Sequence, residues 1–165
     1  MATPSLALLS TGEFRRDRLT NGMVVLTERM AHVRSVALGL WVTVGSRDER
    51  EEKAGISHLM EHMLFQGTAR RSAEEIAAAI DGVGGALDAF TNRESTCFYA
   101  KVLGEHLPLA VDLLADILRH PRLAAADLKK EQQVVLQEIK MVEEDRKSTR
   151  LNSSHPSLSR MPSSA

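Results

Sequence analysis

The sequence predicts an α+β domain, with helices packed on one face of a mostly antiparallel sheet. Two observations lead to this fold class. Short apolar segments with strand character occur in pairs, and so do segments with helical periodicity. The pairs follow each other in the order ββ-αα-ββ-αα, and such runs of strands and helices are typical of α+β folds.

The first pair of strands is indicated by a hairpin signal and by an alternating segment. Asn21-Gly22 lies between apolar residues in LTNGMVV, which is typical of a tight hairpin turn. From Val36 to Val44 large apolar residues alternate with Ala, Gly, Trp and Thr, so we expect a strand covered on both sides. The charged segment SRDEREEK (46–53) that follows predicts a solvated loop.

The remaining elements follow in order along the chain. One helix is expected from near Ser57, and a second begins at Ser72, where Ser72 and Glu75 fit a capping box. Gly84-Gly85 ends this second helix. Two short strands, ALDAF (86–90) and TCFYAKVL (96–103), come next, and two further helices are expected over about 108–118 and 124–145.

Composition bounds the class of protein. A chain of 165 residues with 43% hydrophobic residues can form one domain with a packed core. The net charge of -1 argues against a nucleic-acid partner or an anionic membrane held by bulk charge. The chain has no run of 18 apolar residues to span a membrane, and its single cysteine, Cys97, fits a reducing compartment. We therefore expect a cytoplasmic protein without a signal peptide.

Two histidines and a glutamate, His58, Glu61 and His62, lie within five residues of the largely apolar segment GISHLMEHMLFQGT. On a helix, residues i and i+4 lie on one face with Cβ atoms about 5–6 Å apart, so both histidines can reach one metal ion. Zinc binds imidazole nitrogen readily, and a carboxylate beside a water that zinc activates can accept its proton. The pattern predicts that His58 and His62 bind zinc and that Glu61 is the general base.

The last predicted helix offers a third ligand. Glu131 and Glu138 are two turns apart, close to an apolar stripe that contains Leu128, Val135 and Val142. A glutamate buried beside such a stripe is costly unless it is paired or bound to a cation. We expect Glu138 to bind the zinc and Glu131 to lie one layer away. The alternative is that both glutamates belong to a solvated helix face.

The chain resembles the pitrilysin family of zinc metallopeptidases, in its branch of mitochondrial-processing-peptidase-like and bacterial processing proteases. H-x-x-E-H is the inverted zinc motif of the inverzincins. The gap from His62 to Glu138 also matches the family's spacing for the third ligand. Six segments look like family blocks in family order: LTNGMVVLTE, VALGLWVTVGSRDE, GISHLMEHMLFQGT, LDAFTNREST, FYAKVL and VVLQEIKMVEED.

The resemblance implies a metalloendopeptidase with one Zn²⁺ per chain, acting on peptides or presequence-like segments. It implies that Glu131 is an auxiliary acidic residue of the active site. It also implies that a substrate peptide adds to an edge strand formed by Asp88, Ala89, Phe90, Thr91 and Asn92. Asp88 stands where many members have asparagine, and an ionised aspartate cannot donate a hydrogen bond to a substrate carbonyl.

The resemblance covers residues 13–146 and implies an incomplete first half of the family's two-domain architecture, after an N-terminal extension of residues 1–12. The partner would be the missing C-terminal half or a homologous subunit. Residues 147–165 are rich in serine and without periodicity, so we expect a disordered tail and interpret it as foreign to the native protein. Two alternatives to an active peptidase stay open, namely a non-catalytic structural homologue and a fragment that binds zinc without turnover.

Overall fold

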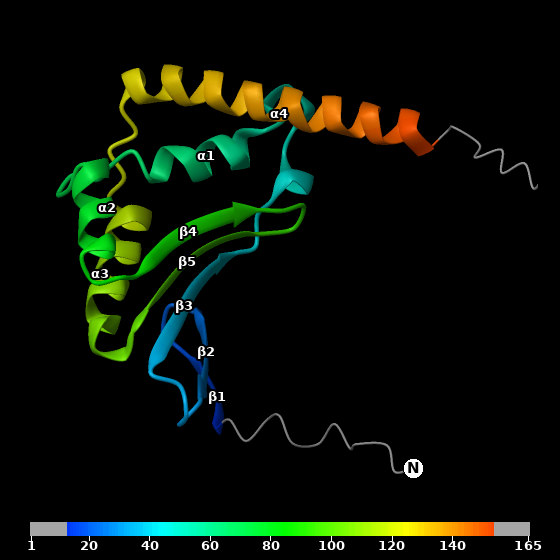
Figure 1. The fold of residues 1–165 in the computed structure, drawn as a ribbon. Helices are drawn as coiled ribbons and strands as arrows, with labels where there is room; N and C mark the ends of the chain where they lie inside the picture. Colours follow the sequence, from blue (N-terminus) through cyan, green and yellow to red (C-terminus); the bar gives the residue numbers. More distant parts are fainter. Residues whose placement is uncertain (1–12, 154–165) are drawn as a thin grey trace, which may run out of the picture.

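The computed structural model describes residues 13–153 of the chain, and the side chains of 13–141 (Figure 1). The predicted N-terminal extension 1–12 and residues 154–165 of the predicted tail lie outside the described residues. The strands are β1 (Glu13–Arg18), β2 (Val24–Arg29), β3 (Ser35–Val42), β4 (Ala86–Thr91) and β5 (Thr96–Leu103). The helices are α1 (Ile56–Leu64), α2 (Ala73–Asp81), α3 (Leu107–Arg119) and α4 (Ala125–Ser153).

The strands form two antiparallel sheets, a hairpin of β1 and β2 and a three-stranded sheet in the order β3-β5-β4. The α+β class is as predicted, with one more strand before α1 than the expected order contained. The extra strand is β1, in which every residue except Phe14 is charged, so it gives no apolar alternation. The hairpin turn lies at Asn21-Gly22, where Gly22 has a φ of 90° and the Asn21 side chain accepts from the Met23 amide.

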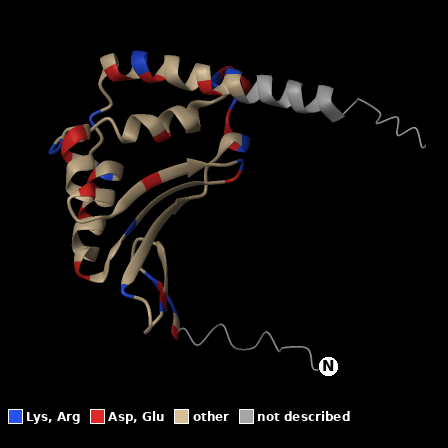
Figure 2. Cartoon of the chain, in the orientation of Figure 1, with Lys and Arg blue, Asp and Glu red and all other residues tan. Residues whose placement is uncertain are grey.

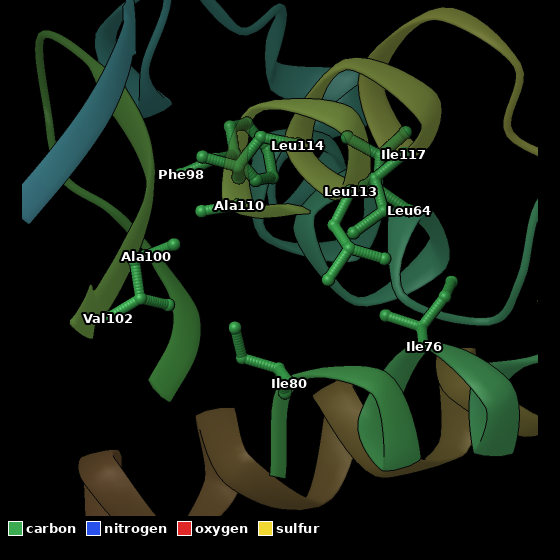
Figure 3. Packing of buried hydrophobic residues seen from close by; sticks show 10 residues of the cluster. All are labelled: Leu64, Ile76, Ile80, Phe98, Ala100, Val102, Ala110, Leu113, Leu114 and Ile117. Atoms are coloured by element: carbon green, nitrogen blue, oxygen red, sulfur yellow. The ribbon is translucent and has the colours of Figure 1, made fainter. Parts of the chain in front are cut away.

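The core lies between the helices and one face of the three-stranded sheet (Figure 3). Leu40, Phe98 and Ala89 are paired across the three strands, so their side chains share this face. The buried cluster consists of Leu64, Ile76, Ile80, Phe98, Ala100, Val102, Ala110, Leu113, Leu114 and Ile117. The opposite face is open among the described residues, because Trp41 is 62% exposed there. The expectation of a strand covered on both sides is therefore wrong for β3 within residues 13–141, where helices lie on one face only.

A buried carboxylate joins α3 to the segment before α2. Asp116, which is 2% exposed, accepts hydrogen bonds from the Thr68 hydroxyl at 2.9 Å and from the Arg71 guanidinium at 2.8 Å. Arg71 also contacts Asp112, one turn earlier on α3. Burial raises the pKa of Asp116, but the bonds from Thr68 and Arg71 outweigh burial and hold that pKa below its ordinary value. The carboxylate is thus an ionised anchor for the chain between α1 and α2.

Helix α2 begins as its sequence predicts. The Ser72 hydroxyl accepts from the Glu75 amide, and the Glu75 carboxylate accepts from the Ser72 amide at 2.8 Å, which completes a capping box. The helix ends at Asp81, three residues before the predicted stop at Gly84-Gly85. Gly84 has a φ of 63°, a conformation in which glycine is favoured, and it lies in the turn into β4.

Helix α4 packs along α1 and continues further than predicted (Figure 1). The sequence predicts its end near Asp145 and disorder from Lys147, whereas the described helix runs to Ser153. Residues 147–153 contain neither proline nor glycine, so no helix breaker stops α4 before Pro156. The serine content alone does not mark the end of this helix.

The described part carries charged residues of both signs, as expected from the net charge of -1. Acidic and basic residues are interspersed over the helices and loops (Figure 2). No helix within residues 13–153 is long and apolar enough to cross a lipid bilayer.

Candidate metal centre and active site

Two helices bring together the three residues predicted to bind a metal. His58 and His62 lie on α1, and Glu138 lies on the part of α4 that packs against it. The Nε2 atoms of the two histidines are 3.2 Å apart. The Oε2 atom of Glu138 lies 3.2 Å from Nε2 of His58 and 3.6 Å from Nε2 of His62. One ligand atom from each residue therefore points to a common centre.

The size and chemistry of this triangle fit zinc. Four ligands arranged tetrahedrally about 2.0–2.1 Å from a zinc ion are separated from each other by about 3.3 Å, and the three observed distances lie close to that value. Two imidazole nitrogens and one carboxylate oxygen form a known donor set of catalytic zinc. The three side chains are 21–38% exposed, so the centre is open to solvent on one side.

A second layer holds the ring of His62. Its Nδ1 atom lies 3.0 Å from Oε2 of Glu131, which is 5% exposed. The side chain of Gln66 donates to the other oxygen of Glu131 at 3.1 Å. A carboxylate on Nδ1 selects the tautomer in which Nε2 carries a lone pair, and it fixes the ring's orientation. Glu131 thus lies one layer from the triangle and contacts it through His62.

Gln66 is a site residue that the sequence interpretation missed. It follows His62 by four residues, as His62 follows His58, although α1 ends at Leu64. This repeated spacing is the signal that could have placed Gln66 beside the histidines.

Glu61 lies on α1 between the two histidines, and its carboxylate contacts the end of β4. Its Oε2 atom accepts a hydrogen bond of 2.5 Å from the hydroxyl of Thr91, the last residue of β4. A cleft between α1 and the end of β4 is lined by Glu61 and His58 on one side and by residues 89–93 on the other. The predicted base and the predicted substrate strand therefore face the same cleft.

Strand β4 is an edge strand among the described residues, because it pairs with β5 alone. The Asn92 amide donates to the Ser95 carbonyl at 2.9 Å where the strands join. Antiparallel pairs alternate, so the backbone groups of Phe90 point toward β5, and those of Ala89 and Thr91 point to the open edge. Within the predicted substrate strand, Ala89 and Thr91 therefore offer free backbone groups at the open edge, and Phe90 does not.

The side chains of Asp88 and Phe90 on β4 have different contacts. Asp88 accepts from the Ala89 amide at 2.8 Å and from the Tyr99 hydroxyl at 3.1 Å. The bond to Asp88 raises the pKa of the Tyr99 hydroxyl. Phe90 meets Trp41 edge to face on the open side of the sheet, with ring centroids 5.6 Å apart. Asp88 therefore already occupies the outward-facing amide of Ala89.

Residues 24–161, most of the chain, match the family model described as insulinase, peptidase family M16. The chain belongs to this family. The predicted resemblance to the pitrilysin family is thereby confirmed, and the matched M16 residues extend beyond Arg146, where the sequence predicted that the resemblance ends.

Known M16 relatives include bacterial and mitochondrial proteins. The chain is 51% identical over 144 residues to an uncharacterized zinc protease of Mycobacterium bovis, a match that covers 87% of this chain and 32% of that protein. It is 40% identical over 136 residues to a probable mitochondrial-processing peptidase subunit beta of Arabidopsis thaliana, covering 82% of this chain and 26% of that protein. The chain thus spans about a third, or less, of the length of these curated relatives.

The M16 fold is also seen in solved structures. The crystal structure of pitrilysin superposes with a TM-score of 0.71 at 33% sequence identity, covering 81% of this chain and 14% of that one. The α+β fold predicted from the sequence is therefore shared with a member of the family that the sequence resembles.

Proposed function

We propose that this chain carries the catalytic zinc centre of an M16 metalloendopeptidase, with one Zn²⁺ held by His58, His62 and Glu138. The observation that supports this most strongly is the convergence of three ligand atoms from two helices within 3.6 Å of one another. Relatives at 51% identity carry the name zinc protease, which favours zinc over other metals that accept the same donors.

Each residue around the centre has a distinct proposed task. A zinc ion held by these residues would supply a Lewis acid able to polarise a peptide carbonyl and to make a water more acidic. Glu61 is the general base that takes the proton of the attacking water and passes it to the leaving amine. Thr91 orients the Glu61 carboxylate through its hydroxyl. Glu131 acts as a positioning residue, since it fixes His62 and does not face the cleft.

The proposed substrate is an extended peptide that adds to the open edge of β4. Ala89 and Thr91 would supply the backbone hydrogen bonds, and Asp88, Phe90 and Asn92 would contact alternate side chains. A substrate carbonyl must replace the Asp88 carboxylate at the Ala89 amide, because that donor is occupied. Presequence-like segments are included in the proposal because one relative is named a mitochondrial-processing peptidase subunit.

The proposed partner is the C-terminal remainder of a longer protein or a homologous subunit. A groove between α1 and α4 offers apolar surface to such a partner, with Ile56 at 41% and Leu136 at 49% exposure. A non-catalytic homologue is the main alternative, and the presence of Glu61 together with all three ligand residues favours the enzyme. The cytoplasmic location and the absence of a nucleic-acid partner stay predictions.

Peptide cleavage tests this function. A protein that contains this chain and has the full length of the curated relatives should cleave unstructured peptides, lose activity with a zinc chelator and regain it with added Zn²⁺. The 165-residue chain assayed beside it should be weak or inactive, because few contacts would position the peptide. A full-length protein that binds zinc and cleaves no peptide from a broad library would support the non-catalytic alternative.

A further inference from the structure

Glu49 lies in the charged loop that the sequence predicted to be solvated, and it is bonded to the start of α1. One carboxylate oxygen accepts from the Gly55 amide at 2.7 Å, and the other accepts from the Ser57 amide at 2.8 Å. The expectation of a solvated loop is wrong at this residue, because the first turn of α1 has unpaired amides that attract a carboxylate.

The cap that Glu49 provides replaces one that the helix itself lacks. The N-cap of α1 is Gly55, whose φ is 90° and which has no side chain to accept from the first turn. Burial raises the pKa of Glu49, but the amides of Gly55 and Ser57 outweigh burial, so this pKa lies below its ordinary value. A charged carboxylate with two short bonds is a strong restraint on the residues that it holds.

The beginning of the same loop is tied to the turn after β4. The Ser46 amide donates to the Asn92 carbonyl at 3.0 Å, and the Arg47 amide donates to the Arg93 carbonyl at 2.9 Å. At Gly45 an added Cβ would lie 2.7 Å from backbone atoms of Arg93 and Glu94, so the two segments are in close contact. The loop therefore connects the end of the proposed substrate strand to the start of the helix that carries the histidines.

The bonded residues adjoin two of the proposed ligands. Ser57 directly precedes His58 in α1. A Cβ added at Gly55 would lie 3.7 Å from Cδ1 of Ile139, the neighbour of Glu138 on α4. A shift of the first turn of α1 would thus move His58 relative to Glu138.

From these contacts we propose that Glu49 is a positioning residue of the metal centre. It fixes the position of the first turn of α1 relative to α4 and β4. The proposal rests on the proposed function, because it assigns Glu49 a task toward the same zinc centre. Glu49 itself is not a ligand, since it acts through the backbone of Gly55 and Ser57.

The test compares two carboxylates that cap helices. Glu49→Gln removes the charge at α1, and Glu75→Gln removes the matched charge at the capping box of α2, away from the metal centre. Zn²⁺ affinity is measured by competition with a chromogenic chelator, Co²⁺ binding by its visible absorption spectrum, and stability by thermal unfolding of the metal-free chain. We expect Glu49→Gln to weaken Zn²⁺ binding by about 10-fold or more and to alter the Co²⁺ spectrum, as for other groups that orient metal ligands.

The control separates a positioning role from general stability. Glu75→Gln should lower the unfolding temperature comparably and leave both metal readouts at the wild-type values. Equal losses of Zn²⁺ affinity in the two variants, or no loss in Glu49→Gln, would overturn the proposal while leaving the zinc centre in place. If Glu49→Gln does not fold, Glu49→Asp serves instead, because it keeps the charge on a shorter side chain. It should weaken Zn²⁺ binding by a smaller factor. Wild-type Zn²⁺ affinity in Glu49→Asp would overturn the proposal. Absence of Zn²⁺ binding by the wild-type chain would instead refute the proposed function.

Discussion

Replacing Glu61 with glutamine in the full-length protein is expected to lower the kcat of peptide cleavage by about 10²–10⁴-fold, the usual contribution of a positioned general base. The amide has nearly the same shape, and its oxygen can still accept from the Thr91 hydroxyl, but it cannot take a proton from water. Zinc content should not change, because Glu61 is not one of the three residues whose ligand atoms converge. The variant should therefore lose kcat while it keeps its zinc.

The measurement is steady-state peptide hydrolysis combined with metal analysis of the same samples. Glu105→Gln is the matched control, since its side chain is 74% exposed and lies outside the cleft. A Glu61→Gln protein that cleaves peptides at a rate near that of the wild type would show that another group is the base. Loss of zinc from this variant would show that Glu61 supports metal binding rather than proton transfer.

The second large effect is expected at Asp116, where Asp116→Ala should lower the free energy of unfolding by about 3 kcal/mol. This is the lower end of the range for breaking a buried ion pair, because Asp112 remains as a partner of Arg71. The pKa of Asp116 is depressed in the folded chain, so its contribution is present above the unfolded pKa of about 3.9 and lost as pH falls through the folded pKa. The difference between wild type and variant should therefore shrink under strongly acidic conditions.

Urea denaturation at neutral pH measures this difference, and Asp112→Ala is the matched control. Asp112 is a partly exposed partner of the same arginine, with a side chain 43% exposed, so its removal should lower the free energy of unfolding much less than Asp116→Ala does. Equal effects of the two substitutions would mean that burial of Asp116 does not govern the strength of this link.

The sequence predicted the elements whose patterns are local. The capping box at Ser72 and the turn at Asn21-Gly22 each depend on a few adjacent residues, and both were found where expected. The i, i+4 spacing of His58 and His62 likewise needs only a helix. These features follow from backbone geometry that neighbouring residues determine.

Features that depend on distant partners were harder to predict. Glu49 is one charge among many in its loop, and only the fold brings it to the amides of Gly55 and Ser57. Gln66 contacts Glu131 across 65 positions of the chain. The open face around Trp41 could not be predicted because alternation shows which residues share a face and does not show what covers that face.

The zinc content of the purified chain tests the central claim most directly. The samples are the wild type, His58→Ala, His62→Ala and the control His106→Ala, whose histidine lies outside the ligand set. Each is dialysed against a weak chelator and then measured by elemental analysis. The account predicts about one Zn²⁺ per chain in the wild type and the control, and loss of most of it in each of the other two variants, since each removes one of three protein ligands. Unchanged zinc in both His58→Ala and His62→Ala would contradict the assignment of the metal centre.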